Sequence, residues 1–423
     1  MLLTINFPSM KKIQRVLILI LLVLSFNQSL GQEISKLSTI NLPSLPAEIE
    51  GAESLGFAGM IGGFNNGVIL AAGGANFPNG LPWEGGTKVW SKNIYILENN
   101  QWRLSSTKLP IPLAYAASIT TDSGILCIGG ENEELTSKNV FLLTYNPTSK
   151  EVTITKYPEL PEPLAYTSAV IDEEYVYVIG GKNSKKTTNS FYRLNLKDKL
   201  KWEKLIDFPG LPRALHCVAI QDTSTNKKLF VFGGRNQVTG EKSQTPTNYL
   251  SYDFRTQTWK DEGELEINGV SRVLMGASTE TMGSMHIMIY GGSDEVLFDQ
   301  LENISLQLSV TQNDSIVNVL KTKRDNILNN HPGFSKEILA YNSITKKHFV
   351  YDSLSIPIPV TALTFKNNDD FIIVSGEVAP GVRTPNVQSF KIADAAHPFG
   401  VINYSVLVLY LLISVMIGIY FVS

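Results

Sequence analysis

The chain of 423 residues is 43% apolar and 18% charged, with a formal net charge of −3. It can therefore bury a sizeable core, and its 32 glycines and 20 prolines suit many short strands joined by turns. A nucleic-acid partner needs a concentrated positive face to neutralise phosphates. The sequence contains no basic block, which excludes that class of function.

The N-terminal residues 1–31 have the pattern of a secretory signal peptide. The basic stretch KKIQR at 11–15 precedes a short apolar run at 16–24, and small residues occupy the −3 and −1 positions of a cleavage site after Gly31. A basic region, a short apolar region and small residues before the cut are the parts of such a signal. We therefore expect the mature protein to be exported.

Residues 32–395 contain a repeated unit. Apolar runs that end in Gly-Gly finish at Gly74, Gly130, Gly181, Gly234 and Gly292, and a degenerate sixth copy finishes at Gly376. The copies are 56, 51, 53, 58 and 84 residues apart, and strand-like segments flank each one. Four short antiparallel strands at a period near 50 residues describe one blade of a kelch-type propeller. The sequence thus predicts an all-β, six-bladed β-propeller.

Two irregular parts of the repeat carry further predictions. The last blade supplies only three strands, and the segment 34–46 reads like an orphan fourth strand, so we predict that the N-terminal segment completes the last blade and removes both free edges. The interval before Gly376 is about 30 residues longer than the others. Residues 294–330 within it have helix-like periodicity and predict a helical excursion above the ring.

Residues 401–422 contain no charged side chain, and 22 residues are enough to cross a bilayer as a helix. Tyr404 and Tyr420 lie near the two edges, where amphipathic rings are favoured. A buried strand is the alternative, and the length of the segment disfavours it. Together with the signal peptide, this segment predicts a propeller in the periplasm, anchored to the inner membrane by a C-terminal transmembrane helix.

The two cysteines, Cys127 and Cys217, lie in apolar strand-like runs of different units. We expect both to be buried free thiols that behave as small apolar side chains. No CxxC motif or Cys/His cluster indicates a metal site, and we expect no cofactor.

In a propeller the loops that follow Gly-Gly emerge on one face and surround one mouth of the central channel. Asn76 and Glu131 occupy such loops, where a polar residue often bonds its own backbone in a turn. The sixth copy differs, because Pro380 and Gly381 form a turn between Glu377 and Arg383. This turn brings a carboxylate and a guanidinium together at the mouth, either as a surface ion pair or as a functional site.

Three further residues near the predicted channel are open to two interpretations. Arg213 and Arg272 begin inner strands, and each could hold a substrate carboxylate or brace neighbouring blades. Trp83 could stack on the face of a sugar or cap its long loop.

The run GEVAPGVRT at 376–384 resembles the GExxPGxRT motif of the N-acetylneuraminate (sialic acid) mutarotases, or epimerases. The stretch GFAGMIGGFNNGVILAAGGANF at 56–77 is similar to the same family, and the resemblance covers about 32–392. The resemblance implies that the substrate is a sialic acid, that Glu377 accepts a proton and that Arg383 contacts the substrate.

The order of these two stretches resembles a cyclically permuted subgroup of that family, because secreted members have the GExxPGxRT segment first and here it comes last. A ring tolerates such permutation when its termini are close. The C-terminal stretch from Asn403 resembles the first helix of sodium/solute symporters, to which some relatives of the subgroup are joined. The membrane and such a symporter are therefore expected partners.

Mutarotation of sialic acid requires a base for the anomeric hydroxyl and an acid for the ring oxygen. We assign Glu377 as the base, Arg383 as the partner of the C1 carboxylate, and Glu131 either as a second acid or as a turn carboxylate. The alternative is a non-catalytic, membrane-tethered kelch module that binds a sugar or a protein, which has no need of the Glu–Arg pair. A copper radical oxidase needs a Tyr–Cys crosslink and His ligands, which the apolar setting of the cysteines disfavours.

Overall fold

The computed structural model describes residues 37–48, 51–197, 201–293, 295–392 and 401–422. The segment 1–31, expected to be a signal peptide, lies outside the described residues. Residues 37–391 form one compact unit, and the helix α4 (Val401–Val422) belongs to another. Side chains of α4 are described for 404–417, and no helix within the described residues is long and apolar enough to cross a membrane.

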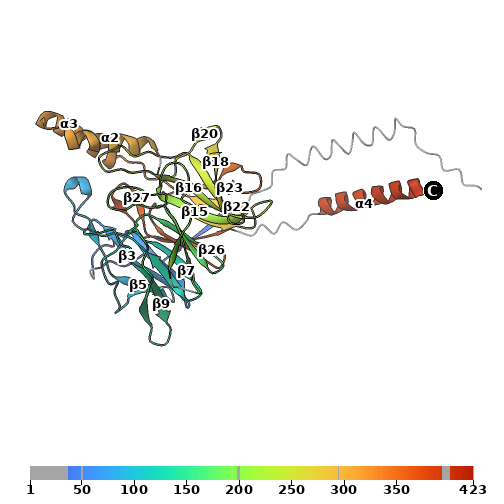
Figure 1. Cartoon of the computed structure of the whole chain (residues 1–423), viewed down its shortest axis with the longest axis horizontal. Helices are drawn as coiled ribbons and strands as arrows, with labels where there is room; N and C mark the ends of the chain where they lie inside the picture. Colours follow the sequence, from blue (N-terminus) through green and yellow to red (C-terminus); the bar gives the residue numbers. More distant parts are fainter. Residues whose placement is uncertain (1–36, 49–50, 198–200, 294, 393–400, 423) are drawn as a thin grey trace, which may run out of the picture. The chain divides into compact units, whose positions relative to one another are not determined.

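Six antiparallel sheets, each with four main strands, make up the larger unit (Figure 1). We number them blades 1 to 6 in chain order. Blade 1 contains β2 (Ala58–Asn65), β3 (Val68–Asn76), β5 (Ile94–Glu98) and β6 (Gln101–Leu104), with the short β4 (Val89–Trp90) beside β3. Blade 2 contains β7 (Ala117–Thr121), β8 (Gly124–Ile128), β9 (Val140–Asn146) and β10 (Glu151–Tyr157). Blade 3 contains β11 (Ser168–Asp172), β12 (Tyr175–Ile179), β13 (Phe191–Asn195) and β14 (Trp202–Lys204).

The second half of the unit continues the pattern. Blade 4 contains β15 (Ala214–Asp222), β16 (Lys227–Arg235), β17 (Asn248–Asp253) and β18 (Thr258–Glu264), followed by the small hairpin β19 (Glu266–Ile267) and β20 (Val270–Ser271). Blade 5 contains β21 (Ser278–Met282), β22 (His286–Tyr290), β23 (Glu337–Asn342) and β24 (His348–Ser353). Blade 6 contains β25 (Leu363–Asn367), β26 (Asp370–Val374), β29 (Val387–Ile392) and β1 (Leu37–Leu42). The prediction of an all-β, six-bladed propeller is confirmed.

Blade 6 is completed by the N-terminal strand β1, which pairs with β29. The Ser38 hydroxyl donates to the carbonyl of Lys391 at 3.2 Å, across 353 positions of sequence, and the Leu45 N–H donates to the carbonyl of Pro385 at 2.9 Å. The expected orphan strand is thus confirmed over the described part of its range. Pairing of the first and last described strands of the larger unit thus completes blade 6.

A closed circle of backbone hydrogen bonds joins the innermost strands, which contact one another in the order β2, β7, β11, β15, β21, β25 and back to β2. One residue at the start of each strand has φ between 50° and 68°, and its N–H donates to the carbonyl of its counterpart in the preceding blade at 2.7–3.2 Å. All six residues line a central channel of about 620 Å³. We call them the channel ring: Gly59, Tyr115, Tyr166, Leu215, Gly276 and Thr361.

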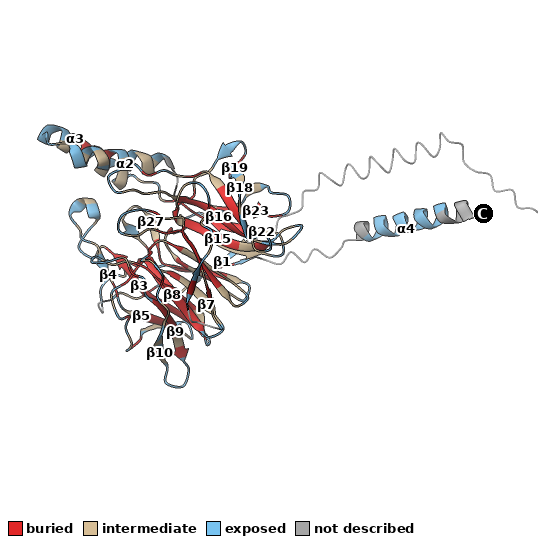
Figure 2. Cartoon of the chain, viewed as in Figure 1, coloured by how far each residue is buried: buried red, intermediate tan, exposed pale blue. Residues whose placement is uncertain are grey.

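The core is divided into apolar clusters that lie between neighbouring blades. Between blades 1 and 2, for example, Ile61 and Leu70 share a cluster with Ile125 and Cys127. Figure 2 shows buried residues along the strands of the blades, whereas the helices of the long insertion are largely exposed. Both cysteines are buried and free, as expected, and burial raises the pKa of the Cys217 thiol to about 12.

The Gly-Gly pairs let the backbone of the next blade approach closely. A Cβ at Gly73 would lie 2.2 Å from the carbonyl oxygen of Leu113, and the N–H of Gly74 donates to that oxygen at 2.8 Å. Blade 6 has Ser375 in place of the first glycine, and its hydroxyl accepts from the N–H of Phe57 at 2.7 Å and donates to a nearby carbonyl. The degenerate sixth copy therefore adds a side-chain contact with the segment before blade 1 to the backbone bond from the Gly376 N–H to the carbonyl of Phe57 at 2.8 Å.

Two helices occupy the long insertion of blade 5, α2 (Glu295–Val310) and α3 (Asp314–Asn329), and they lie beside each other at one edge of the unit (Figure 1). Lys242 in a loop of blade 4 forms an ion pair with Asp299 of α2 at 2.6 Å. At the other end, the indole Nε1 of Trp83 in a loop of blade 1 donates to Asn329 Oδ1 at 3.0 Å. The helical pair thus connects loops from two non-adjacent blades.

Gly59→Ala tests the channel ring. A Cβ at Gly59 would lie 2.4 Å from Cδ1 and 2.7 Å from the backbone nitrogen of Tyr115, at a φ of 68°. We expect the free energy of unfolding, measured in guanidinium, to fall by about 2–4 kcal/mol, from left-handed strain and overpacking together. Gly67→Ala is the matched control, because φ is 86° and nothing lies within 4 Å of its Cβ, so about 1–2 kcal/mol is expected. Equal losses in the two variants would contradict the role of the close approach.

Candidate active site

A two-stranded hairpin after blade 6 strand β26 holds the two residues that the sequence singled out most strongly. Glu377 begins β27 (Glu377–Ala379) and Arg383 ends β28 (Val382–Arg383), and the two residues are direct partners in the antiparallel register. Gly381 lies in the turn with φ of 77°, a conformation that glycine adopts without strain. The hairpin therefore holds the carboxylate and the guanidinium side by side.

The Glu377–Arg383 ion pair is anchored at one end and accessible at the other. Arg383 Nη2 lies 3.0 Å from Glu377 Oε2, and the Arg383 side chain is 4% exposed against 20% for Glu377. Arg383 Nε also donates to the carbonyl of Ala75 at 3.4 Å, and its guanidinium carbon is 4.5 Å from the centroid of the Phe77 ring. Glu377 Oε1 accepts from the N–H of Gly381 at 3.2 Å. Contacts from blade 1 thus fix the arginine, while the carboxylate keeps access to solvent.

Two tyrosines of the channel ring lie next to this pair. The rings of Tyr115 and Tyr166 stack with centroids 4.5 Å apart, and the Tyr166 hydroxyl donates to Glu131 Oε1 at 2.5 Å. Burial raises the pKa of both phenols, and the guanidinium of Arg383 offsets only part of the rise at Tyr115. Both tyrosines are therefore protonated at neutral pH, and the Tyr166 hydroxyl donates its proton to Glu131.

Cations from neighbouring blades complete the cluster. The Lys88 ammonium lies 5.1 Å from the ring centroid of Tyr115 and 5.4 Å from that of Trp90, and the Lys182 ammonium lies 5.0 Å from the ring of Tyr166. Burial lowers the pKa of Lys88, and the charges that act on it are Glu131, Arg383, Glu377 and Lys182. Three cations and two carboxylates are thus gathered at the mouth. No group of three or more His, Cys, Asp or Glu side chains within the described residues could hold a metal ion.

Two other residues predicted from sequence lie beside the cluster and support its loops. Asn76 is buried at the end of β3, and its Nδ2 donates to the carbonyl of Gly56 at 3.3 Å. Trp83 lies in the short 3-10 helix η1 (Pro82–Glu84), where it contacts the hairpin, since a Cβ at Gly381 would be 2.9 Å from its Cζ3.

The two arginines at the start of inner strands lie outside the cluster. Arg213 is buried, and its guanidinium donates to the carbonyl and side-chain oxygens of Asn248 at 2.9 and 2.6 Å, which braces β17 of blade 4. Arg272 forms an ion pair with Glu337 of blade 5 and lines a separate pocket of about 230 Å³. Arg213 thus contacts strands of its own blade, and Arg272 contacts a strand of blade 5.

Sequence reasoning missed most of the aromatic and cationic members of the cluster. A signal existed for Tyr115 and Tyr166, because both follow a repeated Leu-Ala at the start of an inner strand. Lys182 directly follows the second glycine of its pair, at the same loop position as Glu131. Lys88 lies in the irregular loop of blade 1, where no repeat marks it.

Comparisons with known proteins agree with this architecture. A family model described as N-acetylneuraminate epimerase matches residues 27–154 and 157–402. A curated N-acetylneuraminate epimerase of Yersinia enterocolitica is 26% identical over 246 residues, which are 56% of this chain and 57% of that protein. One from Haemophilus influenzae is 36% identical over 102 residues, covering 22% of this chain and 27% of the relative. The chain thus matches less than two thirds of the length of these relatives.

A solved structure titled "Structure of YjhT" has a similar fold, with a TM-score of 0.52 at 16% sequence identity, and the match covers 82% of this chain and 96% of that one. The family model spans most of the chain, from residue 27 to residue 402. On this evidence the chain belongs to the N-acetylneuraminate epimerase family.

Proposed function

We propose that this protein is a sialic acid mutarotase, an isomerase that interconverts the α and β anomers of N-acetylneuraminate. The observation that carries the proposal is the Glu377–Arg383 pair, a partly exposed carboxylate held by a buried guanidinium at the mouth of the channel. Family membership and the names of the relatives support the same substrate.

The reaction needs two coordinated proton transfers and no net change in bonding. Glu377 takes the proton of the C2 hydroxyl, the ring oxygen receives a proton, and the bond between C2 and the ring oxygen breaks to leave a ketone at C2. Rotation about the C2–C3 bond and the reverse transfers then close the ring on the other face. A positioned general base typically accelerates such a step 10²–10⁴-fold.

The second proton-transfer group in this proposal is the Glu131–Tyr166 pair. The Tyr166 hydroxyl donates to Glu131 at 2.5 Å, and this hydrogen bond holds one transferable proton at the mouth of the channel. Tyr115 of the neighbouring blade stacks on Tyr166. Arg383 serves mainly to orient Glu377, because its Nη2 and Nε already bind the carboxylate and the carbonyl of Ala75.

We further propose that the propeller works in the periplasm and is tethered to the inner membrane through residues 401–422. The sequence supports this with the signal-like pattern of residues 1–31 and with 22 consecutive uncharged residues at the C-terminal segment. The late position of the GEVAPGVRT run supports membership of the permuted subgroup, some relatives of which are joined to a sodium/solute symporter, and such a symporter is the membrane partner in this proposal.

Glu377→Gln tests the base. Glutamine keeps the shape of the side chain and cannot accept the proton, so acceleration of mutarotation should fall by about 10²-fold or more, or about 2.7 kcal/mol in the barrier. The rate is followed by proton NMR of freshly released α-sialic acid with the full chain. Glu133→Gln, an exposed change in the loop that contains Glu131, is the matched control and should behave as the parent protein. A parent protein that does not exceed the spontaneous rate would instead favour a non-catalytic binding module.

Arg383→Lys tests the orientation of Glu377. Lysine keeps the charge and cannot contact the carboxylate, the Ala75 carbonyl and the Phe77 ring face together, so kcat/KM should fall about 10- to 100-fold. The loss should appear in kcat, because the orientation of the base changes. An unchanged kcat would show that Arg383 does not position Glu377.

Protease added to spheroplasts tests the location. If the propeller lies outside the inner membrane, added protease should degrade it while a cytoplasmic marker protein stays intact. Protection of the propeller in intact spheroplasts, with digestion only after lysis, would contradict the periplasmic location.

A further inference from the structure

Unpartnered donors gather at the mouth of the channel beside Glu377. The buried atoms Arg383 Nη1 and Trp90 Nε1 have no hydrogen-bond partner within the described part of the chain. The Lys88 ammonium, which lies over the rings of Trp90 and Tyr115, takes part in no hydrogen bond or ion pair among the described residues. The two buried atoms are closed to solvent, whereas Lys88 is partly exposed and is therefore the donor that an acceptor from outside the chain can reach.

Lys88 and Lys182 differ from the other charged groups of the cluster, because neither ammonium takes part in a hydrogen bond or ion pair among the described residues. Of the two, Lys88 is the one on which the charge of Glu377 acts. Arg383 already binds Glu377 and the carbonyl of Ala75, Glu377 also binds the Gly381 N–H, and Glu131 accepts from Tyr166. Lys88 is half-buried, and burial lowers its pKa although the carboxylates of Glu131 and Glu377 act to raise it, so the cation carries a desolvation cost in this position. An anionic ligand at the mouth removes that cost.

The position of Lys88 also suits the reacting carbon of the substrate. Both Glu131 and Glu377 act electrostatically on its ammonium, so it lies in the field of the two carboxylates that the proposed reaction uses. In N-acetylneuraminate the carboxylate is attached to C2, the same carbon that carries the anomeric hydroxyl. A carboxylate held near Lys88 therefore brings that hydroxyl into the neighbourhood of Glu377.

We propose that Lys88 binds the carboxylate of the substrate and so selects anionic sugars over neutral ones. The rings of Trp90 and Tyr115 hold its ammonium in place through cation–π contacts. This inference rests on the proposed function for the identity of the sugar, and it assigns to Lys88 the carboxylate contact that the sequence analysis assigned to Arg383. A neutral sugar leaves the cation uncompensated and is bound more weakly.

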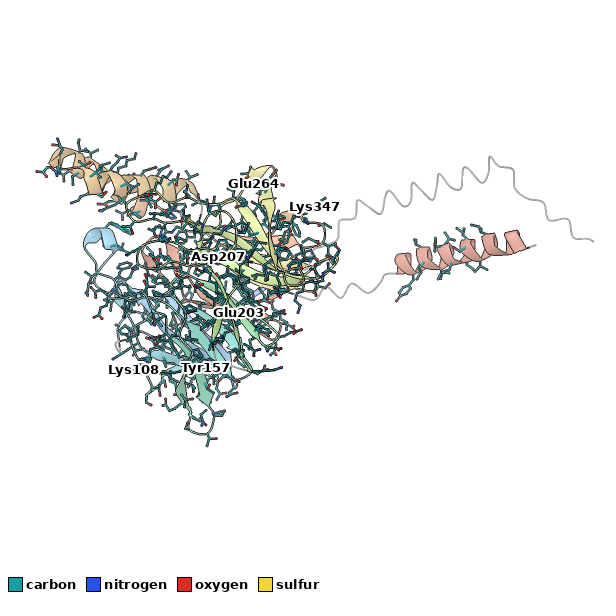
Figure 3. All side chains as sticks on the ribbon, in the orientation of Figure 1. Lys108, Tyr157, Glu203, Asp207, Glu264 and Lys347 are labelled. Carbon is teal, nitrogen blue, oxygen red and sulfur yellow. The ribbon has the colours of Figure 1, made fainter. Side chains whose placement is uncertain are left out.

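The test compares N-acetylneuraminate with its uncharged C1 methyl ester, using the full chain. Lys88→Met should raise KM for the acid roughly 10- to 100-fold, the effect of one charged hydrogen bond, and leave KM for the ester unchanged. The value of kcat should stay within about threefold for both. Lys108→Met is the matched control, an exposed lysine outside the site (labelled in Figure 3), and it should change neither parameter.

Two kinetic results would overturn the proposal. An unchanged KM for the acid in Lys88→Met would mean that another group binds the substrate carboxylate, and Arg383 would be the first candidate. A fall in kcat for both substrates at constant KM would make Lys88 a proton donor. Circular dichroism of each variant establishes that the fold is retained.

Calorimetric titration with N-acetylneuraminate separates this inference from the proposed function. If the parent protein binds the acid, Lys88→Met binds it 10- to 100-fold more weakly, and neither turns it over, then the mutarotase function fails and the role of Lys88 stands. If the parent protein does not bind the acid at all, the role of Lys88 is overturned.

Discussion

The circle of six backbone hydrogen bonds in the channel ring is the constraint on which the site depends. Each bond joins one blade to the preceding one, and the last joins Gly59 to Thr361, so every blade is fixed by both neighbours. The left-handed φ of these residues turns the chain at the start of each inner strand. Tyr115 and Tyr166 belong to this circle, so the backbone that closes the channel also positions the aromatic part of the site.

One repeated backbone supports an asymmetric site. The equivalent ring position holds a tyrosine in blades 2 and 3, leucine in blade 4 and glycine in blades 1 and 5. The glycine of blade 1 leaves room for Tyr115, whose ring occupies the space that a Cβ at Gly59 would need. The tyrosines therefore lie beside blade 1, and the hairpin of blade 6 contacts blade 1 through Arg383, whose guanidinium lies over the ring of Phe77.

The sequence was sufficient to predict the blades and the Glu377–Arg383 pair, since both depend on local pattern. The lengths of the strands and turns set the period of the Gly-Gly pairs, and Glu377 and Arg383 are only six positions apart in the sequence. Lys88 and Tyr115 could not be predicted as neighbours of Glu377, because that proximity arises only when blade 6 closes on blade 1. The role of Arg213 was ambiguous for a related reason. Its partner Asn248 lies on another strand, and no local sequence pattern shows that Arg213 is buried.

Strand β1 has a consequence for the time course of folding. It pairs with β29 across almost the whole unit, and Arg383 reaches Ala75 across 308 positions. Contacts this distant in sequence form slowly and only after most of the chain is present. Blades 1 to 5 can pack as a growing arc during this time, with exposed strand edges at both ends that invite aggregation. Because Glu377 and Tyr115 come together at the closing seam, a complete site exists only in molecules that have finished folding.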